Sequence, residues 1–438
     1  MDITHVSNSF LIVESAASKL VCDPWVGRAN HGGWRAYPEF DREQLIVRVR
    51  GADLVYISHL HSDHFDPDFL VEAGLVTAPF LIKAYDNKTL RRRLEALGVQ
   101  TVIEAQPFTP LTVRDLRLAV IPQFQTSNAG VETDLAYDLD TSLVVGADRQ
   151  VFFNQVDNPL SPAHFQSIKA FCDREFGPID VAALVCGAAG EYPQCFLNLD
   201  RAAEQARIIE SSLAKLEAAL RALQPARVFL AGGTYFIPGR LTELSRFIAQ
   251  PTLGQAAGRC AFVPFVALEG GRKLSLPAAT VTQDLAPTRA GLAEVQAAYV
   301  DEAYPYEAAA MPDEAQLDAL FARAQAAFET ALAAQGVRLD IDYEFRLYDG
   351  LTEDAARDGA HLRQIALAVR TGETSAEPTR LRLHLDVRAF ALCLTRGQSW
   401  NQTISGSLAL QERWPNVHQP DALFALNYLA ASPQAAHA

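Results

Sequence analysis

The chain has 438 residues, of which 49% are hydrophobic and 21% are charged. This length exceeds what one ordinary hydrophobic core needs and predicts a globular protein of two or three domains. The formal net charge of −14 argues against a nucleic-acid partner, because proteins that bind the phosphate backbone concentrate Lys and Arg.

The amino terminus begins Met1-Asp2-Ile3-Thr4, with no apolar run long enough for a membrane span and no basic-then-apolar leader. We therefore expect a soluble cytoplasmic protein that has no membrane partner. The six cysteines are widely spaced and form no C-x-x-C pair, which indicates reduced thiols and argues against an iron–sulfur cluster.

Short β-rich runs separated by turns occupy the first 60 residues, as at 9–13, 20–22 and 54–57. Asp66 followed by Pro67 predicts the start of a helix, with an N-cap side chain and proline at the first helical position. The stretch between residues 57 and 66 is therefore a loop from a strand to a helix.

Strands and helices alternate over the next 170 or so residues, which predicts a layered α/β domain. The expected strands are 101–103, 116–121, 142–145, 150–153, 181–185 and 228–230, and the expected helices are 87–97, 163–175 and 200–223. Glycine and proline accumulate between about 250 and 285, where the periodicity fades. We expect a first domain over 1–255, a linker over 256–285 and a second domain over 286–438.

The second domain is predicted to be a smaller α+β unit. Residues 311–334 form an amphipathic helical pattern, and 339–348 and 380–387 alternate like strands, with 371–378 as a hairpin-type loop between them. The Trp400-Asn401-Gln402 segment of this domain is expected to recruit a substrate, a carrier or a second subunit. The sequence does not decide among these three roles, and it does not decide whether the protein forms a homo-oligomer.

Histidine is scarce in this chain, yet three of its ten histidines lie between residues 59 and 64 in the stretch HLHSDH. Alternate residues of such a loop can point the same way, so His59 and His61 are expected to bind one metal ion. Asp63 and His64, turned by the loop, are placed to bind a second. The alternative is that these are surface polar residues ahead of a helix.

The stretch ADLVYISHLHSDH, residues 52–64, resembles the metallo-β-lactamase superfamily. The resemblance implies an αββα sandwich with its metal site at the edge between the two sheets. It also implies three further ligands downstream, namely a histidine, a bridging aspartate and a last histidine. Asp157, which follows the strand 150–153, matches the aspartate as bridging or terminal ligand; the alternative is that it caps the helix near 161.

Neither downstream histidine is present: the chain reads Gln123-Phe124-Gln125 where the first is expected and Gly233-Thr234-Tyr235 where the last is expected. Several pieces in order along the chain resemble a branch that includes CMP-N-acetylneuraminate hydroxylase and its bacterial relatives. They are CDPWVGRANHGGW, DTSLVV, GAAGEYPQCF, AGGTYFIP and WNQTISGSLALQERWP. That hydroxylase carries a Rieske iron–sulfur domain ahead of this region, and we expect none here.

Two histidines and one carboxylate on one face leave open coordination positions, as in non-haem iron oxygenases. We therefore favour a metalloenzyme with one or two irons at His59, His61, Asp63, His64 and Asp157. It is expected to oxygenate a small polar metabolite and to draw electrons from the substrate or from a separate reductase. The alternatives are a zinc or manganese hydrolase of an ester, lactone or phosphodiester, and a binding protein without activity. Glu132, Asp134 or Gln125 are candidates to complete a second metal site.

Residues around this centre are candidates for catalysis or substrate contact. Asp63 is the expected proton acceptor of a hydrolase, and Tyr235 is a candidate contact to substrate or an oxygen intermediate. The candidates for the surrounding shell are Asp23, His31, Trp34, Gln125, Tyr192 and Thr234. Asp23 is expected to orient a metal-bound histidine, although an Asp-Pro turn explains it equally well; packing is the alternative for Trp34 and Tyr192.

Overall fold

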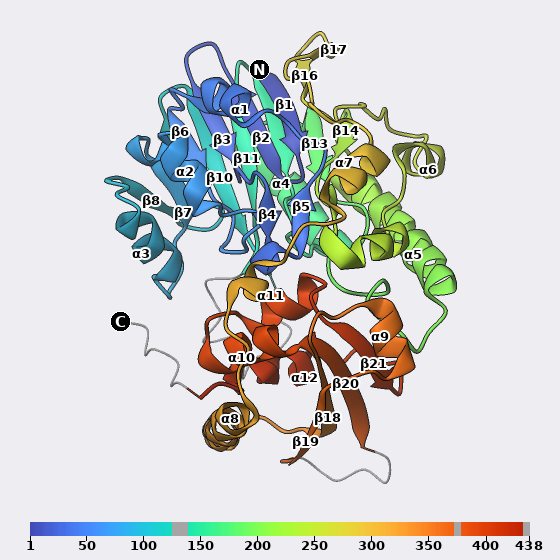
Figure 1. Cartoon of the computed structure of the whole chain (residues 1–438). Helices are drawn as coiled ribbons and strands as arrows, with labels where there is room; N and C mark the ends of the chain where they lie inside the picture. Colours follow the sequence, from blue (N-terminus) through green and yellow to red (C-terminus); the bar gives the residue numbers. More distant parts are fainter. Residues whose placement is uncertain (125–138, 372–377, 432–438) are drawn as a thin grey trace.

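Two β-sheets lie face to face in the larger, amino-terminal part of the computed structural model, which describes residues 1–124, 139–371 and 378–431 (Figure 1). The two sheets share one hydrophobic core. Leu11 and Tyr56 from the first sheet and Leu143, Phe152 and Phe229 from the second all belong to it, and each is fully buried. The alternating side chains of each strand place one apolar face of each sheet in this core.

The first sheet contains eight strands. In spatial order they are β17 (Thr280–Gln283), β16 (Arg272–Ser275), β1 (Asp2–Ser7), β2 (Phe10–Glu14), β3 (Lys19–Cys22), β6 (Leu54–Tyr56), β7 (Phe80–Lys83) and β8 (Val102–Ala105). The strands from β3 to β8 are parallel. The outer face is covered by α1 (Arg42–Val49), α2 (Pro67–Glu72), η2 (Leu75–Thr77) and α3 (Thr89–Ala96).

The second sheet contains six strands. In spatial order they are β14 (Val228–Leu230), β13 (Val181–Leu184), β12 (Gln150–Asn154), β11 (Thr141–Ala147), β10 (Leu116–Pro122) and β9 (Leu111–Val113). Its outer face is covered by α4 (Pro162–Glu175), α5 (Arg201–Leu223) and α6 (Leu253–Arg259). Helices therefore cover both outer faces of two packed sheets, which confirms the predicted αββα sandwich.

A three-stranded sheet lies at one end of this sandwich. It is formed by β4 (Arg28–Ala29), β5 (Trp34–Ala36) and β15 (Tyr235–Phe236), with η1 (Asn30–Gly32) between the first two. The 3-10 helix η5 (Gly239–Phe247) follows β15. Pairing of Tyr235 with Ala36 brings the loop of residues 30–33 next to a segment some 200 residues later in the chain.

The smaller carboxyl-terminal domain is an α+β unit, as predicted, built on a four-stranded sheet. Its strands, in spatial order, are β19 (Arg363–Arg370), β18 (Asp340–Tyr348), β20 (Thr379–Asp386) and β21 (Leu410–Trp414). Its helices are α8 (Glu314–Gln335), α9 (Glu353–Asp358), α10 (Val387–Thr395), α11 (Trp400–Ser405), α12 (Pro420–Ala425) and η7 (Leu426–Tyr428).

The predicted hairpin in this domain is wrong, because β18 and β20 pair in parallel and two strands joined by a short turn must be antiparallel. The strand β19 stands between them in the chain and pairs antiparallel with β18. The connection from β19 to β20 runs through 372–377, outside the described residues.

The structure also differs from the expected linker over 256–285. Residues 272–283 form β16 and β17, and β16 pairs with β1 from Asp2 to His5. This pairing supplies hydrogen-bond partners to an edge of the first sheet that would otherwise be open. The helices α7 (Leu292–Tyr299) and η6 (Pro305–Ala308) then lead toward the carboxyl-terminal domain.

No helix in the described ranges is both long and apolar enough to cross a membrane. All six cysteines lie within those ranges, each is buried, and none forms a disulfide. The prediction of reduced thiols agrees with this arrangement.

Candidate metal centre

The histidine-rich stretch forms the loop between β6 and α2, as predicted. Asp66 is the N-cap of α2 and accepts a hydrogen bond from the backbone N–H of Phe69. Its second carboxylate oxygen accepts a hydrogen bond from the backbone N–H of Val26. This bond ties the loop to the segment that follows β3. The side chains of His59 and His64 are fully buried, so the alternative of a surface polar loop is wrong for these two.

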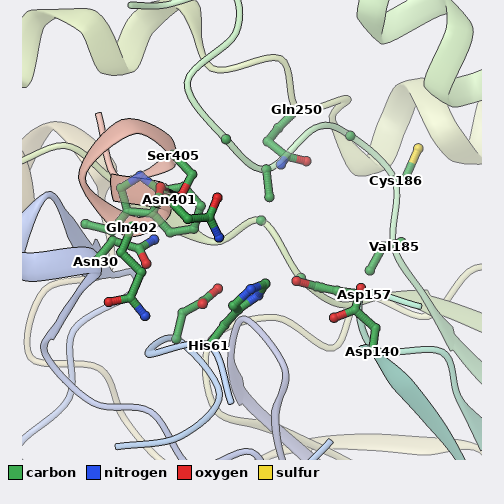
Figure 2. A pocket seen from close by; sticks show the side chains of 17 residues that line it. Asn30, His61, Asp140, Asp157, Val185, Cys186, Gln250, Asn401, Gln402 and Ser405 are labelled. Carbon is green, nitrogen blue, oxygen red and sulfur yellow. Dashed lines mark hydrogen bonds between the residues drawn. The ribbon is translucent and has the colours of Figure 1, made fainter. Parts of the chain in front are cut away.

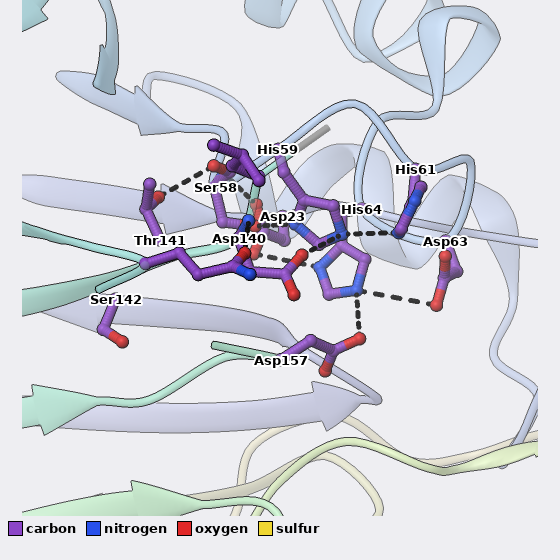
Figure 3. Close-up of polar contacts among 12 residues, drawn as sticks. Asp23, Ser58, His59, His61, Asp63, His64, Asp140, Thr141, Ser142 and Asp157 are labelled. Carbon is purple, nitrogen blue, oxygen red and sulfur yellow. Dashed lines mark hydrogen bonds and ion pairs between the residues drawn. The ribbon is translucent and has the colours of Figure 1, made fainter. Parts of the chain in front are cut away.

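A first group of donor atoms converges around His59. Its Nε2 lies 2.9 Å from His61 Nδ1 and 3.1 Å from a carboxylate oxygen of Asp140 (Figure 3). Two ring nitrogens this close repel each other unless a proton or a cation lies between them, so the arrangement fits a metal ion. Asp140 immediately precedes β11, and its backbone N–H donates to the side chain of Gln123.

A second group of donor atoms converges around His64. Its Nε2 lies 3.1 Å from Asp157 Oδ2 and 3.5 Å from Asp63 Oδ2. Ligand atoms of His59, His61 and Asp140, and likewise of His59, His64 and Asp157, all lie within 4.8 Å of one another. These residues are therefore placed to hold one or two metal ions.

The two buried histidines are oriented from behind by hydrogen-bonding groups. Asp23 Oδ2 lies 3.2 Å from His64 Nδ1, and Asp23 Oδ1 accepts a hydrogen bond of 2.8 Å from the backbone N–H of Ser58. Ser58 Oγ lies 2.9 Å from His59 Nδ1. Contacts of this kind fix the ring so that the opposite nitrogen points at the metal. Asp23 therefore lies where the orienting role requires it.

The electrostatics of the cluster favour a cation at its centre. Burial and then the neighbouring imidazoles hold the pKa of His59 well below its usual value, so its ring is neutral. Burial also opposes charge on His64, but the carboxylates of Asp63 and Asp157 outweigh it and raise the pKa of His64. Burial opposes charge on Asp157 as well, yet His64 lowers its pKa. A metal ion can replace the proton that His64 carries among these carboxylates.

The donor groups open into a pocket of about 330 Å³. His61, Asp63, Asp140 and Asp157 line one part of it, and glycines of the segments 187–190 and 232–233 line another. Asn401, Gln402 and Ser405 of α11 form a further wall, with His61 between them and Asp157 (Figure 2). The pocket therefore lies between the two domains.

Trp34, one of the candidates for substrate contact, lines this pocket. Its ring stacks on that of Tyr235, with centroids 3.9 Å apart and planes at 22°. The hydroxyl of Tyr235 is directed to the carbonyl of Gly190 at 3.4 Å, and Tyr235 is not among the lining residues. Thr234 accepts a hydrogen bond from the backbone N–H of Asn8. The structure thus places Tyr235 and Thr234 behind the pocket wall.

Two other predicted contact residues lie away from the pocket. His31 Nε2 accepts a hydrogen bond of 3.0 Å from the backbone N–H of Ser399, just ahead of α11. The hydroxyl of Tyr192 donates to Glu204 at 2.6 Å. Gln125, Glu132 and Asp134 lie outside the described residues.

Sequence reasoning missed Asp140 and most of the pocket wall. Asp140 begins the piece DTSLVV, and Pro122 pairs with Thr141, so Asp140 stands beside the strand end where the first histidine was expected. An acidic residue directly before a strand was the available signal. Asn30, Gln250 and the α11 residues had no such signal, because only the tertiary fold brings them together.

Comparison with known proteins gives relatives by sequence but no matching family model. The chain is 32% identical over 209 residues to a Rieske 2Fe-2S iron–sulfur protein of Mycolicibacterium smegmatis, a match that covers 47% of this chain and 38% of that protein. It is 27% identical over 251 residues to the cytidine monophosphate-N-acetylneuraminic acid hydroxylase of Gorilla gorilla gorilla, covering 54% of this chain and 38% of the hydroxylase. The matches thus span less than two fifths of either relative.

Similar solved structures cover about three fifths of the chain. CmlA, a diiron β-hydroxylase from Streptomyces venezuelae, aligns with a TM-score of 0.44 at 16% identity, over 63% of this chain and 54% of CmlA. A metal-dependent hydrolase from Veillonella parvula aligns with a TM-score of 0.43 at 12% identity, over 63% of this chain and 99% of the hydrolase.

The layers of the sandwich and the place of the donor groups agree with what the resemblance implied. Both sheets carry helices on their outer faces. The His/Asp groups lie where β6 of one sheet and β12 of the other end and where β11 begins. The chain is similar in sequence to the hydroxylase and to the Rieske proteins. Its amino-terminal domain is an αββα sandwich, the fold that the resemblance to the metallo-β-lactamase superfamily implies, with His and Asp side chains placed to hold a metal ion at the edge between the two sheets.

Proposed function

We propose that this protein is a non-haem iron oxygenase, with one or two irons, that acts on a small polar molecule. The observation that carries the proposal is the carboxylate of Asp140, which lies 3.1 Å from His59 Nε2 and beside the strand end where the resemblance implied a histidine. With Asp63 and Asp157, the centre offers three carboxylates alongside the imidazoles of His59, His61 and His64. An oxygen-rich donor set favours iron or manganese over zinc.

The residues of the chain divide the work as follows. His59, His61 and Asp140 would hold one iron, and His64 and Asp157, with Asp63, would hold a second. Bound iron supplies the activation of dioxygen. Asp23 and Ser58 keep the rings of His64 and His59 turned toward the centre, and Trp34 and α11 line the pocket in which a substrate would bind. Asp63 also lines the pocket, with Oδ2 at 3.5 Å from His64 Nε2.

Oxygenation also needs electrons. Inserting one oxygen atom into a C–H bond and reducing the other to water consumes two electrons from outside the substrate. We propose that a separate reductase supplies them. The sequence similarity to a hydroxylase and to Rieske iron–sulfur proteins supports redox chemistry.

Elemental analysis of protein purified without oxygen, combined with oxygen uptake over a panel of small polar metabolites, tests this proposal. We expect iron at one or two equivalents per chain and substrate-dependent oxygen consumption when a chemical or enzymatic reductant is present. Stoichiometric zinc, together with a turnover rate that does not depend on oxygen, would overturn the proposal.

A zinc or manganese hydrolase is the second candidate, and one observation favours it. The HLHSDH loop is intact, and Asp63 both lines the pocket and lies 3.5 Å from His64 Nε2, where it could accept a proton from an attacking water. Hydrolysis of an ester, lactone or phosphodiester at an unchanged rate under argon would favour this candidate over the oxygenase.

A further inference from the structure

The helix α11 is held between the rest of the carboxyl-terminal domain and the loop of residues 30–33. The indole N–H of Trp400, which is buried, donates to the carbonyl of Leu429 at 2.9 Å and anchors the helix to its own domain. On the other side, His31 accepts a hydrogen bond of 3.0 Å from the backbone N–H of Ser399, directly ahead of the helix. The neutral ring this bond needs is favoured by burial, which lowers the pKa of His31 to about 4.

The end of α11 touches the loop of residues 30–33 backbone to backbone. A Cβ on Gly33 would collide with the carbonyl of Gly406, and a Cβ on Gly406 would meet the side chain of Asn30. The backbone N–H of Asn30 in turn donates to Ser62 Oγ at 2.7 Å, inside the HLHSDH loop. This chain of contacts fixes the position of α11 relative to the metal donors.

The wall that α11 presents is made of uncharged hydrogen-bonding groups. Neither side-chain amide of Asn401 or Gln402 forms a hydrogen bond with any residue that the structure describes, although both line the pocket. Across the pocket, the side chain of Gln250 lies against Gly187 and Gly233, where a Cβ would collide with it, and its Nε2 donates to Ala188. The amides of Asn401 and Gln402 are therefore available to bind polar groups of a ligand, and the amide of Gln250 is held in place across the pocket from them.

No Lys or Arg lines the pocket among the described residues. The sequence of residues 125–138 contains none either. The carboxylates that line the pocket, from Asp63, Asp140 and Asp157, all belong to the donor groups. Cys186 is a neutral lining group, because burial, with a smaller effect of Cys260, raises the pKa of its thiol to about 12. A phosphate or carboxylate away from the metal would therefore lose water without gaining a cationic partner.

We propose that α11 is the substrate-recognition wall of this centre, and that the substrate is an uncharged molecule bearing amide or hydroxyl groups. Asn401 and Gln402 determine this specificity, and nucleotides and other polyanions are excluded. The proposal rests on the metal centre of the proposed function and adds the class of molecule bound beside it. It also gives the Trp400-Asn401-Gln402 segment the first of its three predicted roles, recruitment of substrate.

The test uses three hydroxamic acids, each with a hydroxamate group that binds the metal and a two-carbon chain. They differ only in the group at the end of that chain, which is a carboxamide, a carboxylate or an isopropyl group. Binding to the metal-loaded full chain is measured by calorimetry. We expect the carboxamide to bind about tenfold more tightly than the other two, as one or two hydrogen bonds gained in a partly dry pocket allow. In the Asn401→Ala and Gln402→Ala variants, this preference should fall about threefold or more.

The isosteric variants Asn401→Asp and Gln402→Glu keep the shape of α11 and should likewise reduce the preference for the carboxamide. Gln100→Ala, which removes an exposed amide outside the pocket, should leave it unchanged. Equal or tighter binding of the carboxylate, or a carboxamide preference that survives both Ala variants, would overturn the proposal. If none of the three acids binds and elemental analysis finds no metal, the metal centre itself is wrong, whereas metal with no carboxamide preference refutes only the role of α11.

Discussion

At the scale of single residues, Asp140 is what distinguishes the proposed iron centre from a histidine-rich zinc site. Its carboxylate oxygen lies 3.1 Å from His59 Nε2, within the group that His61 completes. Replacing it with an imidazole by Asp140→His should shift the metal preference toward zinc, since nitrogen donors suit zinc. When cells are supplied with equal iron and zinc, we expect the zinc-to-iron ratio in the purified variant to rise about tenfold or more. Elemental analysis measures it.

The matched control for this change is Asp173→His, which places the same residue on the exposed surface of α4. Its metal ratio should equal that of the unaltered protein. An Asp140→His variant that still takes up iron in the original proportion would show that Asp140 does not bind the metal.

Asp23 tests the contribution of a residue that holds a ligand without touching the metal. Its carboxylate faces His64 Nδ1 at 3.2 Å and is fully buried. In Asp23→Asn, the side-chain amide can donate to His64 Nδ1, where the carboxylate could only accept. The His64 ring would then rotate or change its tautomer. We expect metal affinity to fall about 10- to 100-fold, measured by competition with a chelator. Asp53→Asn changes a carboxylate outside both donor groups and should keep the affinity; an unchanged affinity in Asp23→Asn would contradict the orienting role.

At the scale of elements, sequence reasoning succeeded where the signal was local. The Asp66-Pro67 start of α2 and the strand β6 both lie where they were expected, because capping and hydrophobic runs act over a few residues. It failed for β16 and β17, whose mixed polar sequence becomes strand only through pairing with the edge at β1. It failed for β19 for a related reason: its register is set by β18, not by a turn.

The contact between the loop of residues 30–33 and the end of α11 gives a test at this scale. Gly33 has an ordinary backbone conformation, so Gly33→Ala acts only through the collision of its new Cβ with the carbonyl of Gly406. We expect a loss of about 1–3 kcal/mol in the free energy of unfolding, because neither backbone can move freely, and weaker binding of the carboxamide probe. Urea unfolding and calorimetry measure the two effects.

Gly258→Ala is the matched control for that variant. Gly258 lies in α6, exposed, with open space where a Cβ would stand. Alanine there should leave stability unchanged or raise it by about 0.5–1 kcal/mol, since it favours the helix. If Gly33→Ala behaves like Gly258→Ala, the two domains are not held together by this contact.

At the scale of the whole molecule, the centre is assembled from segments far apart in the chain. The HLHSDH loop could be identified from the sequence because its donors are contiguous. Asp157 could be identified because the resemblance implies an aspartate directly after a strand, and Asp157 follows the strand predicted at 150–153. Asp140 and the amides of α11 meet these residues only after two sheets and a second domain have packed, so no local pattern marks them.

Packing of the sandwich also makes the stability of the whole molecule depend on pH through His5. This residue of β1 is 1% exposed, and its Nε2 donates to the carbonyl of Asn8 at 2.8 Å. Burial lowers the pKa of His5 from 6.5 to about 4, an effect that the Asn8 carbonyl only partly opposes. Below pH 6.5 the unfolded chain therefore binds a proton that the folded chain rejects, so folding stability falls as the pH drops from about 6.5 to 4.

The largest contribution of this one group is about 3 kcal/mol, reached near pH 4. His5→Gln removes the titrating ring and keeps an N–H that can donate to Asn8, so its unfolding free energy should fall less steeply over the same pH range. Urea unfolding of both proteins, in the same metal state and between about pH 7 and pH 4.5, measures the difference, since the titration of the metal centre is common to both. The two stability curves should separate progressively as the pH falls below about 6.5. Parallel curves would mean that His5 is protonated in the folded protein. The core between the two sheets would then accept a charge that the burial of His5 should exclude.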